Sequence, residues 1–203
     1  MFIKFPLEPL IIFKEQEAIS EDSSNEALIW KKFKEGDKDA YSFIYKKYFE
    51  IIFRYGRKIN PDRDLVKDSI HDLFVELWKN KDRLGEPTSI KNYLLKSIRR
   101  KLYRISSKSK FFTQLENIEN YQKNFISSHE AFLIDKQSKQ DLKEKLFNAL
   151  NKLTKRQKEA VYLIFYEKLS YQEVSSIMSL KVRTVYNVVF NAIKVLKINM
   201  DPH

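Results

Sequence analysis

Residues 169–194 read LSYQEVSSIMSLKVRTVYNVVFNAIK, and this stretch predicts two short helices joined by a tight turn. Ser170, followed three residues later by Glu173, is the pattern of a capping box, in which two side chains satisfy free backbone N–H groups at a helix start. Apolar residues then recur at helical spacing: Val174, Ile177, Met178, Val182, Val185, Val188 and Val189. The expected helices are 171–178 and 182–198, and their spacing is typical of a helix-turn-helix, whose second helix enters the major groove of DNA.

The second of these helices would present a polar face of the kind that contacts DNA. Arginine, asparagine and threonine side chains can read base edges, whereas lysine mainly holds phosphate groups. The candidate residues are Lys181, Arg183, Thr184, Tyr186, Asn187, Asn191 and Lys194. Many all-helical proteins contain two short helices at such a spacing, so this pattern alone leaves a purely structural interpretation open.

A basic run without any acidic residue occupies positions 87–115. Its cations are Lys91, Lys96, Arg99, Arg100, Lys101, Arg104, Lys108 and Lys110. Because these groups cannot pair with one another, they favour an outside polyanion, of which a nucleic-acid backbone is the commonest. A solvated basic helix face is the alternative, since charge runs are often only that.

The apolar spacing inside this run predicts a helix over about 89–104. The residues expected to point inward are Ile90, Leu94, Ile98, Leu102 and Ile105. The opposite arc holds Asn92, Tyr93, Lys96, Arg99, Arg100, Tyr103 and Arg104. Basic groups can bind phosphates and tyrosine rings can stack on bases, a combination that suits single-stranded DNA better than a closed duplex. Either tyrosine could instead pack at the edge between two helices.

A second strong helical pattern covers about 62–80, directly after the break at Asn60-Pro61. Its apolar face comprises Val66, Ile70, Leu73, Phe74, Leu77 and Trp78. On nearly the opposite face four acidic residues repeat every four positions: Asp64, Asp68, Asp72 and Glu76. Like charges at this spacing repel by roughly 0.2–0.5 kcal/mol per pair, and a basic partner surface would relieve that repulsion. A soluble outer face without a partner is the alternative.

The composition of the 203-residue chain favours an all-α fold and restricts its chemistry. With only three glycines and five prolines, neither a glycine-rich phosphate loop nor a turn-dense β architecture is expected. The chain has no cysteine, so disulfides and thiolate zinc sites are excluded. The apolar stretch 1–13 is short and interrupted by two prolines, and it predicts neither a signal peptide nor a membrane span. The net charge of +11 again favours a polyanionic partner.

These patterns divide the chain into four parts. An N-terminal extension would cover 1–24, a first helical domain 25–107, a linker 108–138 and a second helical domain 139–201. In the second domain, two further helices are expected near 140–152 and 155–167. The linker is rich in Ser, Asn, Gln and Lys, and we expect a flexible tether with one short helix near 111–121. Both domains are basic, which suggests two contacts with the same polyanion.

Taken in order, the motifs of the chain resemble those of RNA polymerase sigma factors of the extracytoplasmic-function (ECF) type. Residues 36–48, GDKDAYSFIYKKY, resemble that family's opening pattern G-D-x-x-A-F-x-x-L-Y-x-x-Y. Residues 64–74, DLVKDSIHDLF, with Trp78 resemble its D-L-V-Q-E-x-F-x-x-x-W helix. LTKRQ at 153–157 and LSYQEV at 169–174 resemble L-P-x-x-Q and L-S-Y-x-E-I. Each motif is moderately specific, and the ordered set is much more so.

The resemblance implies a transcription initiation factor that binds core RNA polymerase and promoter DNA and is not an enzyme. The first domain would be sigma region 2, with its polymerase contact at Asp64, Asp68, His71, Asp72, Glu76 and Trp78. The same domain would melt and hold the −10 promoter element with Thr88, Ser89, Asn92, Tyr93, Lys96, Arg99, Arg100, Tyr103 and Arg104. The second domain would be sigma region 4, which would read the −35 element through the polar face of 182–198. The absence of cysteine fits a cytoplasmic location. The resemblance also implies, as a further partner, an anti-sigma factor of the kind that commonly sequesters such proteins.

The chain departs from the family pattern at several positions that bear on base preference. Ser175 and Ser179 stand where the helix-turn-helix usually has a small residue and a glycine. Lys181 replaces the usual helix cap, and Val188 occupies a position that is often basic. Residues 98–100 read Ile-Arg-Arg in place of the family's A-R-N. The preferred bases of either promoter element therefore do not follow from the resemblance.

Two other functions compete with the sigma-factor interpretation. A stand-alone helix-turn-helix regulator would explain the second domain, but it gives no role to the acidic helix or to the basic helix with its tyrosines. A metal phosphohydrolase is suggested only by His71-Asp72, and such sites need several further histidines, whereas only His129 and His203 remain. No metal and no cofactor are therefore expected.

Replacing Arg99 and Arg100 by alanine should abolish promoter opening while binding to core polymerase survives, because the basic helix and the acidic helix carry separate contacts. Permanganate footprinting of melted promoter DNA and co-elution with core polymerase measure the two properties separately. Loss of polymerase binding in this double variant would contradict the assignment of the basic helix to DNA.

Overall fold

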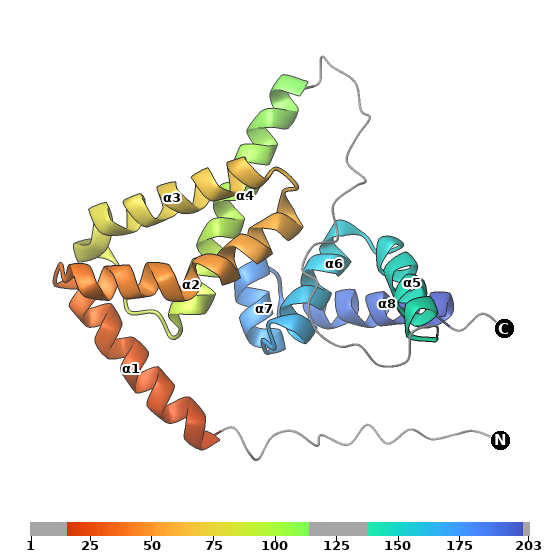
Figure 1. Cartoon of the computed structure of the whole chain (residues 1–203), viewed down its shortest axis with the longest axis horizontal. Helices are drawn as coiled ribbons and strands as arrows, with labels where there is room; N and C mark the ends of the chain where they lie inside the picture. Colours follow the sequence, from red (N-terminus) through yellow and green to blue (C-terminus); the bar gives the residue numbers. More distant parts are fainter. Residues whose placement is uncertain (1–15, 114–137, 201–203) are drawn as a thin grey trace.

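The structure, a computed structural model, describes residues 16–113 and 138–200, and every regular element in these ranges is helical (Figure 1). The N-terminal domain consists of α1 (Gln16–Lys34), α2 (Lys38–Ile59), α3 (Arg63–Asn80), the 3₁₀ turn η1 (Lys81–Arg83) and α4 (Ile90–Thr113). The C-terminal domain consists of α5 (Ser138–Asn151), α6 (Lys155–Val161), the π-helical turn η2 (Tyr162–Tyr166), α7 (Tyr171–Met178) and α8 (Val182–Met200). The all-α fold expected from the sequence is confirmed.

Aspartate side chains start the two helices that carry the first two family motifs. Asp37 precedes α2, and its carboxylate accepts hydrogen bonds from the backbone N–H groups of Asp39 at 2.7 Å and Ala40 at 3.2 Å. Asp62 caps α3 in the same way, directly after the predicted chain break. An N-cap carboxylate accepts hydrogen bonds from backbone N–H groups that have no partner within the helix. Its negative charge also interacts favourably with the positive N-terminal end of the helix dipole. The start of each helix is therefore encoded locally.

The core of the N-terminal domain lies between α2, α3 and α4. The apolar positions predicted for α3 and α4 are buried, including Val66, Ile70, Leu94, Ile98 and Leu102, all of which have no exposed side-chain surface. Helix α1 covers the remaining side with Trp30 and Phe33, both 1% exposed. Two predicted core residues, Trp78 and Ile105, are only half-buried.

The helix-turn-helix predicted for 169–198 is present as α7 and α8. Ser170 Oγ accepts a hydrogen bond from the backbone of Glu173 at 3.3 Å, and the Glu173 carboxylate accepts one from the backbone of Ser170 at 2.7 Å. Helix α7 ends at Ser179, whose φ of 54° and ψ of 48° lie in the left-handed region. Serine thus adopts the conformation for which glycine is usual, at a cost of about 1–2 kcal/mol.

The predicted apolar residues of this motif are mostly buried, with two exceptions on α8. Those with at most 2% exposure are Val174, Ile177, Met178, Val185 and Val189. Val182 is 36% exposed at the start of α8 and Val188 is half-buried, because both lie toward the edge of its buried face.

The two domains pack directly against each other, with α4 against α7 and α2 against α6 (Figure 1). Most of their buried apolar residues form one continuous cluster. The sequence patterns gave no indication of this contact, because a helix that has already buried one face shows no periodic signal for a second neighbour. Most of the predicted linker, with the short helix expected near 111–121 beyond Thr113, lies outside the described residues.

Three helix boundaries differ from the sequence-based expectation. Helix α1 begins at Gln16, inside the stretch expected to be an extension. Helix α4 continues to Thr113 rather than ending near 104, because no glycine or proline interrupts the chain there. The helix expected over 155–167 is α-helical only to Val161 and then widens into η2.

Gly56 marks the closest approach of α2 to its neighbours, and alanine at this position should destabilise the fold. A Cβ atom there would lie 2.7 Å from Val66 Cγ1 of α3 and 3.4 Å from Leu102 Cδ1 of α4. We expect Gly56→Ala to lower the free energy of unfolding by about 1–3 kcal/mol, since overpacking outweighs the helix propensity that alanine adds. Urea denaturation measures the change. The matched control is Gly85→Ala, whose Cβ would meet nothing within 4 Å, and an equal loss in both variants would contradict the packing explanation.

The capping carboxylate of α7 should make stability depend on pH. Burial raises the pKa of Glu173, but hydrogen bonds from Ser170 and from Asn92 outweigh it and hold the pKa below its ordinary value. Ionised Glu173 therefore contributes its full stabilisation of the folded state when the pH is above its ordinary pKa of about 4.3. This contribution is lost as the pH falls through the lower pKa of the folded state.

Thermal unfolding of the wild-type protein and of Glu173→Gln should therefore differ at pH 7 and converge as the pH is lowered below about 4. Glu50→Gln, on the exposed side of α2, is the control, and it should match the wild type at neutral pH. A constant difference between wild type and Glu173→Gln across this pH range would contradict the role of the ionised carboxylate.

Candidate nucleic-acid interface

Helix α8 presents the polar face that the sequence predicts for contact with duplex DNA. Lys181, Arg183, Tyr186, Asn187, Asn191 and Lys194 are exposed, and Thr184 is half-buried. The opposite face of α8 is fixed by Val185, Val189 and Ala192, each at most 1% exposed. Tyr186 stacks on Tyr171 of α7 with ring centroids 3.9 Å apart. The structure thus brings the whole predicted set to one accessible face of a rigidly packed helix.

The predicted single-strand-binding residues of α4 do not share one face, and the structure separates them into two groups. Asn92, Lys96, Arg99 and Tyr103 lie against the C-terminal domain, where each makes a polar contact. Tyr93, Arg100 and Arg104 instead line a cavity beside α3. An arc of about 140° on a helical wheel is wide enough to meet two different neighbours, which explains the division.

The contact centred on Glu159 of α6 buries a carboxylate among three donors from the N-terminal domain. Its oxygens accept hydrogen bonds from Arg99 Nε at 2.7 Å, from the Tyr55 hydroxyl at 2.7 Å and from the Tyr103 hydroxyl at 3.1 Å. The Arg99 guanidinium also lies 4.4 Å from the centre of the Tyr103 ring. Glu159 is only 4% exposed, so its carboxylate is a buried charge that is both paired and hydrogen-bonded.

This arrangement shifts the ionisation of its members in consistent directions. Burial lowers the pKa of Arg99, but its hydrogen bond with Glu159 and the charge of that carboxylate more than offset this, and the pKa is raised. Burial and the Glu159 carboxylate raise the pKa of Tyr55 well above its ordinary value. The pKa of Tyr103 is also raised, and burial is again the largest cause. The arginine therefore stays charged and both phenols stay protonated at neutral pH.

A cavity of about 270 Å³ opens between α3, α4 and the chain that follows α3. Tyr93 and Arg100 line one side, and Asn80, Leu84 and Glu76 line other parts of it. An aromatic ring and a guanidinium beside a polar opening can hold a flat, hydrogen-bonding group. The Tyr93 ring also packs edge-on with Trp30 of α1, at 5.4 Å between ring centroids. This tyrosine therefore also packs between two helices, α1 and α4.

Helix α1 fixes both ends of the loop that joins η1 to α4, a role that sequence reasoning missed. Trp30 Nε1 donates a hydrogen bond to the carbonyl of Gly85 at 3.0 Å. Glu26 accepts one from the backbone of Ile90 at 3.1 Å and another from the Tyr48 hydroxyl. A tryptophan and a phenylalanine three residues apart near the end of this helix were the available signal, but nothing in the sequence identifies the loop as their partner.

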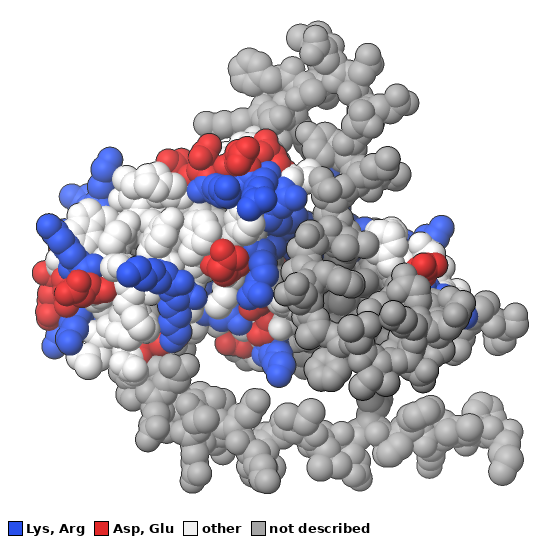
Figure 2. All heavy atoms as spheres, viewed as in Figure 1, with Lys and Arg blue, Asp and Glu red and all other residues white. Residues whose placement is uncertain are grey.

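The acidic face of α3 is exposed over most of its predicted extent. Asp64, Asp68, His71 and Asp72 are exposed, and Figure 2 shows acidic atoms gathered along the edge of the molecule where α3 lies. Glu76 is also exposed but bonds to the buried Lys101 of α4 at 2.6 Å, and Asp72 lies 3.5 Å from the same ammonium group. Part of the acidic stripe therefore already has a basic partner within the fold.

An aromatic row runs along α2 beside the acidic stripe, and it was not predicted as a site. Tyr45, Phe49 and Phe53 follow at intervals of four residues, with neighbouring centroids 5.4 and 6.0 Å apart. Trp78 lies on the same side of the domain, where its ring packs against that of Tyr41 with centroids 5.0 Å apart. These rings are partly buried, and the surface between α2 and α3 is largely uncharged in Figure 2.

No group of three or more His, Cys, Asp or Glu side chains suited to a metal ion occurs within 16–113 and 138–200. In the same part of the chain, no helix is long and apolar enough to cross a membrane.

Comparison with known proteins gives a family for the C-terminal domain and a fold for the chain. Residues 143–196 match the family model described as Sigma-70, region 4. No curated protein sequence matches the chain.

Two solved structures share the fold at low sequence identity. The sigma factor RpoE of Bartonella quintana, solved in complex with the anti-sigma factor NepR, is 21% identical with a TM-score of 0.63, over 81% of this chain and 98% of that one. CnrH, solved in complex with the cytosolic domain of CnrY, is 14% identical with a TM-score of 0.56, over 85% and 94% of the two chains. The C-terminal domain is therefore a sigma-70 region 4 domain, and the chain has the fold of a sigma factor, in agreement with its resemblance to the ECF type.

Proposed function

We propose that this protein is a transcription initiation factor that binds core RNA polymerase in the cytoplasm and directs it to promoters. The observation that carries the proposal is the region 4 match over 143–196, combined with the exposed polar face of α8 within it. The polymerase performs the chemistry, and this chain supplies promoter specificity and helps to open the strands.

Helix α8 reads the −35 element from the major groove. Arg183, Asn187 and Asn191 are the residues able to make base contacts, and Lys181 and Lys194 hold phosphates. The stack of Tyr171 on Tyr186 ties α8 to α7 at the start of this face, so the two helices approach the duplex as one unit. Support for this assignment comes from the accessibility of the whole set on one side of the helix.

The N-terminal domain holds the melted −10 element with the cavity face of α4. Tyr93 offers a ring to an unpaired base, while Arg100 and Arg104 lie beside it for the strand's phosphates. Thr88 and Ser89 precede α4 on the loop that Trp30 and Glu26 hold in place. The contacts of α1 with this loop support the assignment, because strand capture needs a loop of fixed shape.

Core polymerase docks on α3 and the adjoining aromatic row of α2. Asp64, Asp68 and His71 provide the exposed polar part of this surface, and Tyr45 and Phe49 the apolar part. Acidic groups beside partly buried rings fit a basic, amphipathic partner surface. Because Asp72 and Glu76 share Lys101, we assign them a smaller role in docking than the sequence suggested.

We further propose an anti-sigma factor as a regulator of this chain. RpoE, the sigma factor whose fold covers most of the chain, was solved with such a partner. The proposal rests on this similarity of fold and on the resemblance to the ECF type.

The function is tested by co-elution of the purified chain with bacterial core RNA polymerase at near-physiological salt. The wild type should form a stoichiometric complex, and Asp68→Arg should weaken it at least about tenfold, because the charge is reversed at the centre of the α3 face. Glu50→Arg, which reverses one negative charge at an exposed position of α2 in the same way, is the control and should bind like the wild type. Absence of any complex with the wild type, alongside retained binding to duplex DNA, would overturn the proposal in favour of a stand-alone helix-turn-helix regulator.

A further inference from the structure

Helix α1 makes three polar contacts with the segment that leads into α4, and the residues that make them share one face of the helix. These residues, Glu26, Trp30 and Lys34, follow one another at intervals of four positions. Residues four apart in an α-helix are neighbours on the same side, one turn after another. One face of α1 is therefore directed at the loop 84–89 between η1 and α4.

Trp30 links this loop to the ring of Tyr93. Its indole Nε1 donates a hydrogen bond to the carbonyl of Gly85 at 3.0 Å, and its ring packs edge-on with Tyr93 at 5.4 Å between centroids. Gly85 directly follows Leu84, and Leu84 and Tyr93 both line the cavity beside α3. Trp30 is only 1% exposed, so the close-packed core fixes its position. One buried side chain therefore helps to set the distance between two walls of this cavity.

Glu26 fixes the other end of the loop by capping α4 from a different helix. Its carboxylate accepts a hydrogen bond at 3.1 Å from the backbone N–H of Ile90, the first residue of α4. The same carboxylate is held from α2, where the Tyr48 hydroxyl donates to it and Lys47 Nζ lies 3.7 Å away. A carboxylate at a helix start accepts a bond from an unpaired backbone donor and interacts favourably with the dipole. The start of α4 is therefore anchored to α1 and α2.

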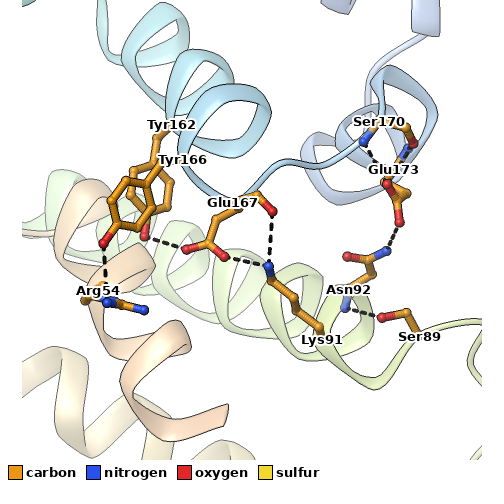
Figure 3. A network of polar contacts seen from close by, with 9 residues as sticks. All are labelled: Arg54, Ser89, Lys91, Asn92, Tyr162, Tyr166, Glu167, Ser170 and Glu173. Carbon is orange, nitrogen blue, oxygen red and sulfur yellow. Dashed lines mark hydrogen bonds and ion pairs between the residues drawn. The ribbon is translucent and has the colours of Figure 1, made fainter. Parts of the chain in front are cut away.

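The other contacts at the two ends of the loop are weaker. Ser89 Oγ accepts a hydrogen bond from the backbone N–H of Asn92 at 3.4 Å, as Figure 3 shows at the start of α4. This distance is longer than that of an ordinary hydrogen bond. Lys34 Nζ lies 3.7 Å from the carboxylate of Glu86, which is exposed, so this pair contributes little. The contacts of Trp30 and Glu26 are therefore the ones that fix the loop.

We infer that Glu26 and Trp30 are positioning residues that set the base preference at the −10 element without contacting DNA themselves. The inference rests on the proposed function, which assigns the loop and the cavity face of α4 to the melted strand. A base contact is most selective when the groups that make it are held in one arrangement before the base arrives. Thr88 is exposed on the loop between its two anchored ends, and Tyr93 lines the cavity.

The position of α1 separates this role from the other functions of the chain. Helix α1 packs on α2 and η1, whereas polymerase docking is assigned to the exposed face of α3 and duplex reading to α8. A loop released from α1 should therefore change recognition of the −10 element alone. A general loss of folded protein would instead reduce polymerase binding and recognition of both promoter elements together.

The test measures promoter preference with the full-length protein bound to core RNA polymerase. The template is a pool of linear DNAs randomised over the −35 and −10 segments, each with a barcode in its transcribed part. Sequencing of the RNA products gives the base preference at both elements in one reaction. Co-elution with core polymerase is measured for each variant in parallel.

Two substitutions release the loop in different ways. Trp30→Phe removes the indole donor but keeps an aromatic ring in the core, and Glu26→Ala removes the acceptor for Ile90. Each should reduce the ratio between favoured and disfavoured bases at the −10 element by about two- to tenfold, the factor that one hydrogen bond is worth. Preference at the −35 element and binding to core polymerase should not change. Glu26→Gln should retain the wild-type preference, because its amide oxygen can still accept the bond from Ile90.

Phe33→Leu is the matched control for Trp30→Phe. Phe33 lies three residues further along α1, is also 1% exposed, and has no polar side-chain atom with which to hold the loop. Its substitution should lower the thermal stability and leave the −10 preference unchanged. Glu35→Ala, which removes an exposed negative charge directly after α1, is the control for Glu26→Ala and should match the wild type.

An unchanged −10 preference in Glu26→Ala, or in a folded Trp30→Phe, would overturn the inference. An equal change in Phe33→Leu, a parallel change at the −35 element, or an active wild type without any −10 preference would also overturn it. Glu26 is partly exposed, so its substitution decides the question even if Trp30→Phe does not fold. All these results leave the proposed function standing, whereas a wild type that forms no complex with core polymerase would contradict that function itself.

Discussion

Helix α4 contains no acidic residue, and the surrounding structure is organised around this excess of positive charge. Carboxylates from other helices form ion pairs with several of its cations. Lys101 is buried and bonded to Glu76 of α3, while Arg99 and Lys91 are paired with Glu159 and Glu167 of the C-terminal domain. A buried charge without a partner would cost several kcal/mol, so these pairs determine which neighbours α4 can have.

The pairing divides α4 into surfaces with different consequences for function. Its apolar face holds the N-terminal domain together, and the Lys101 side joins it to the acidic helix α3. The Arg99 side meets the C-terminal domain, and the cavity side keeps Arg100 and Arg104 accessible. In contrast, α8 contributes one buried face and one exposed face, so its predicted DNA-binding residues all remain available. The structure thus leaves the predicted DNA-binding face of α8 accessible and covers part of the predicted DNA-binding arc of α4.

Sequence reasoning succeeded for features that depend on neighbours within a few residues. The Ser170–Glu173 capping box is present because it is formed within one turn of helix. Buried residues of α3, α4, α7 and α8 follow the apolar periodicity for the same reason. It did not indicate which neighbours the two sides of the α4 arc meet, as with Tyr93 and Tyr103, nor a partner distant in sequence, as with Trp30 and the carbonyl of Gly85.

The sequence by itself determined the all-α fold, the starts of the main helices, the helix-turn-helix and the resemblance to sigma factors, since these depend on local spacing and on ordered motifs. Only the tertiary structure decided which cations of α4 are paired and which are accessible. Glu159 and Arg99 are 60 residues apart, and their contact depends on the packing of whole domains. A charge in a sequence shows what a side chain can bind, but its actual partner is set by the three-dimensional arrangement that brings an opposite charge to it.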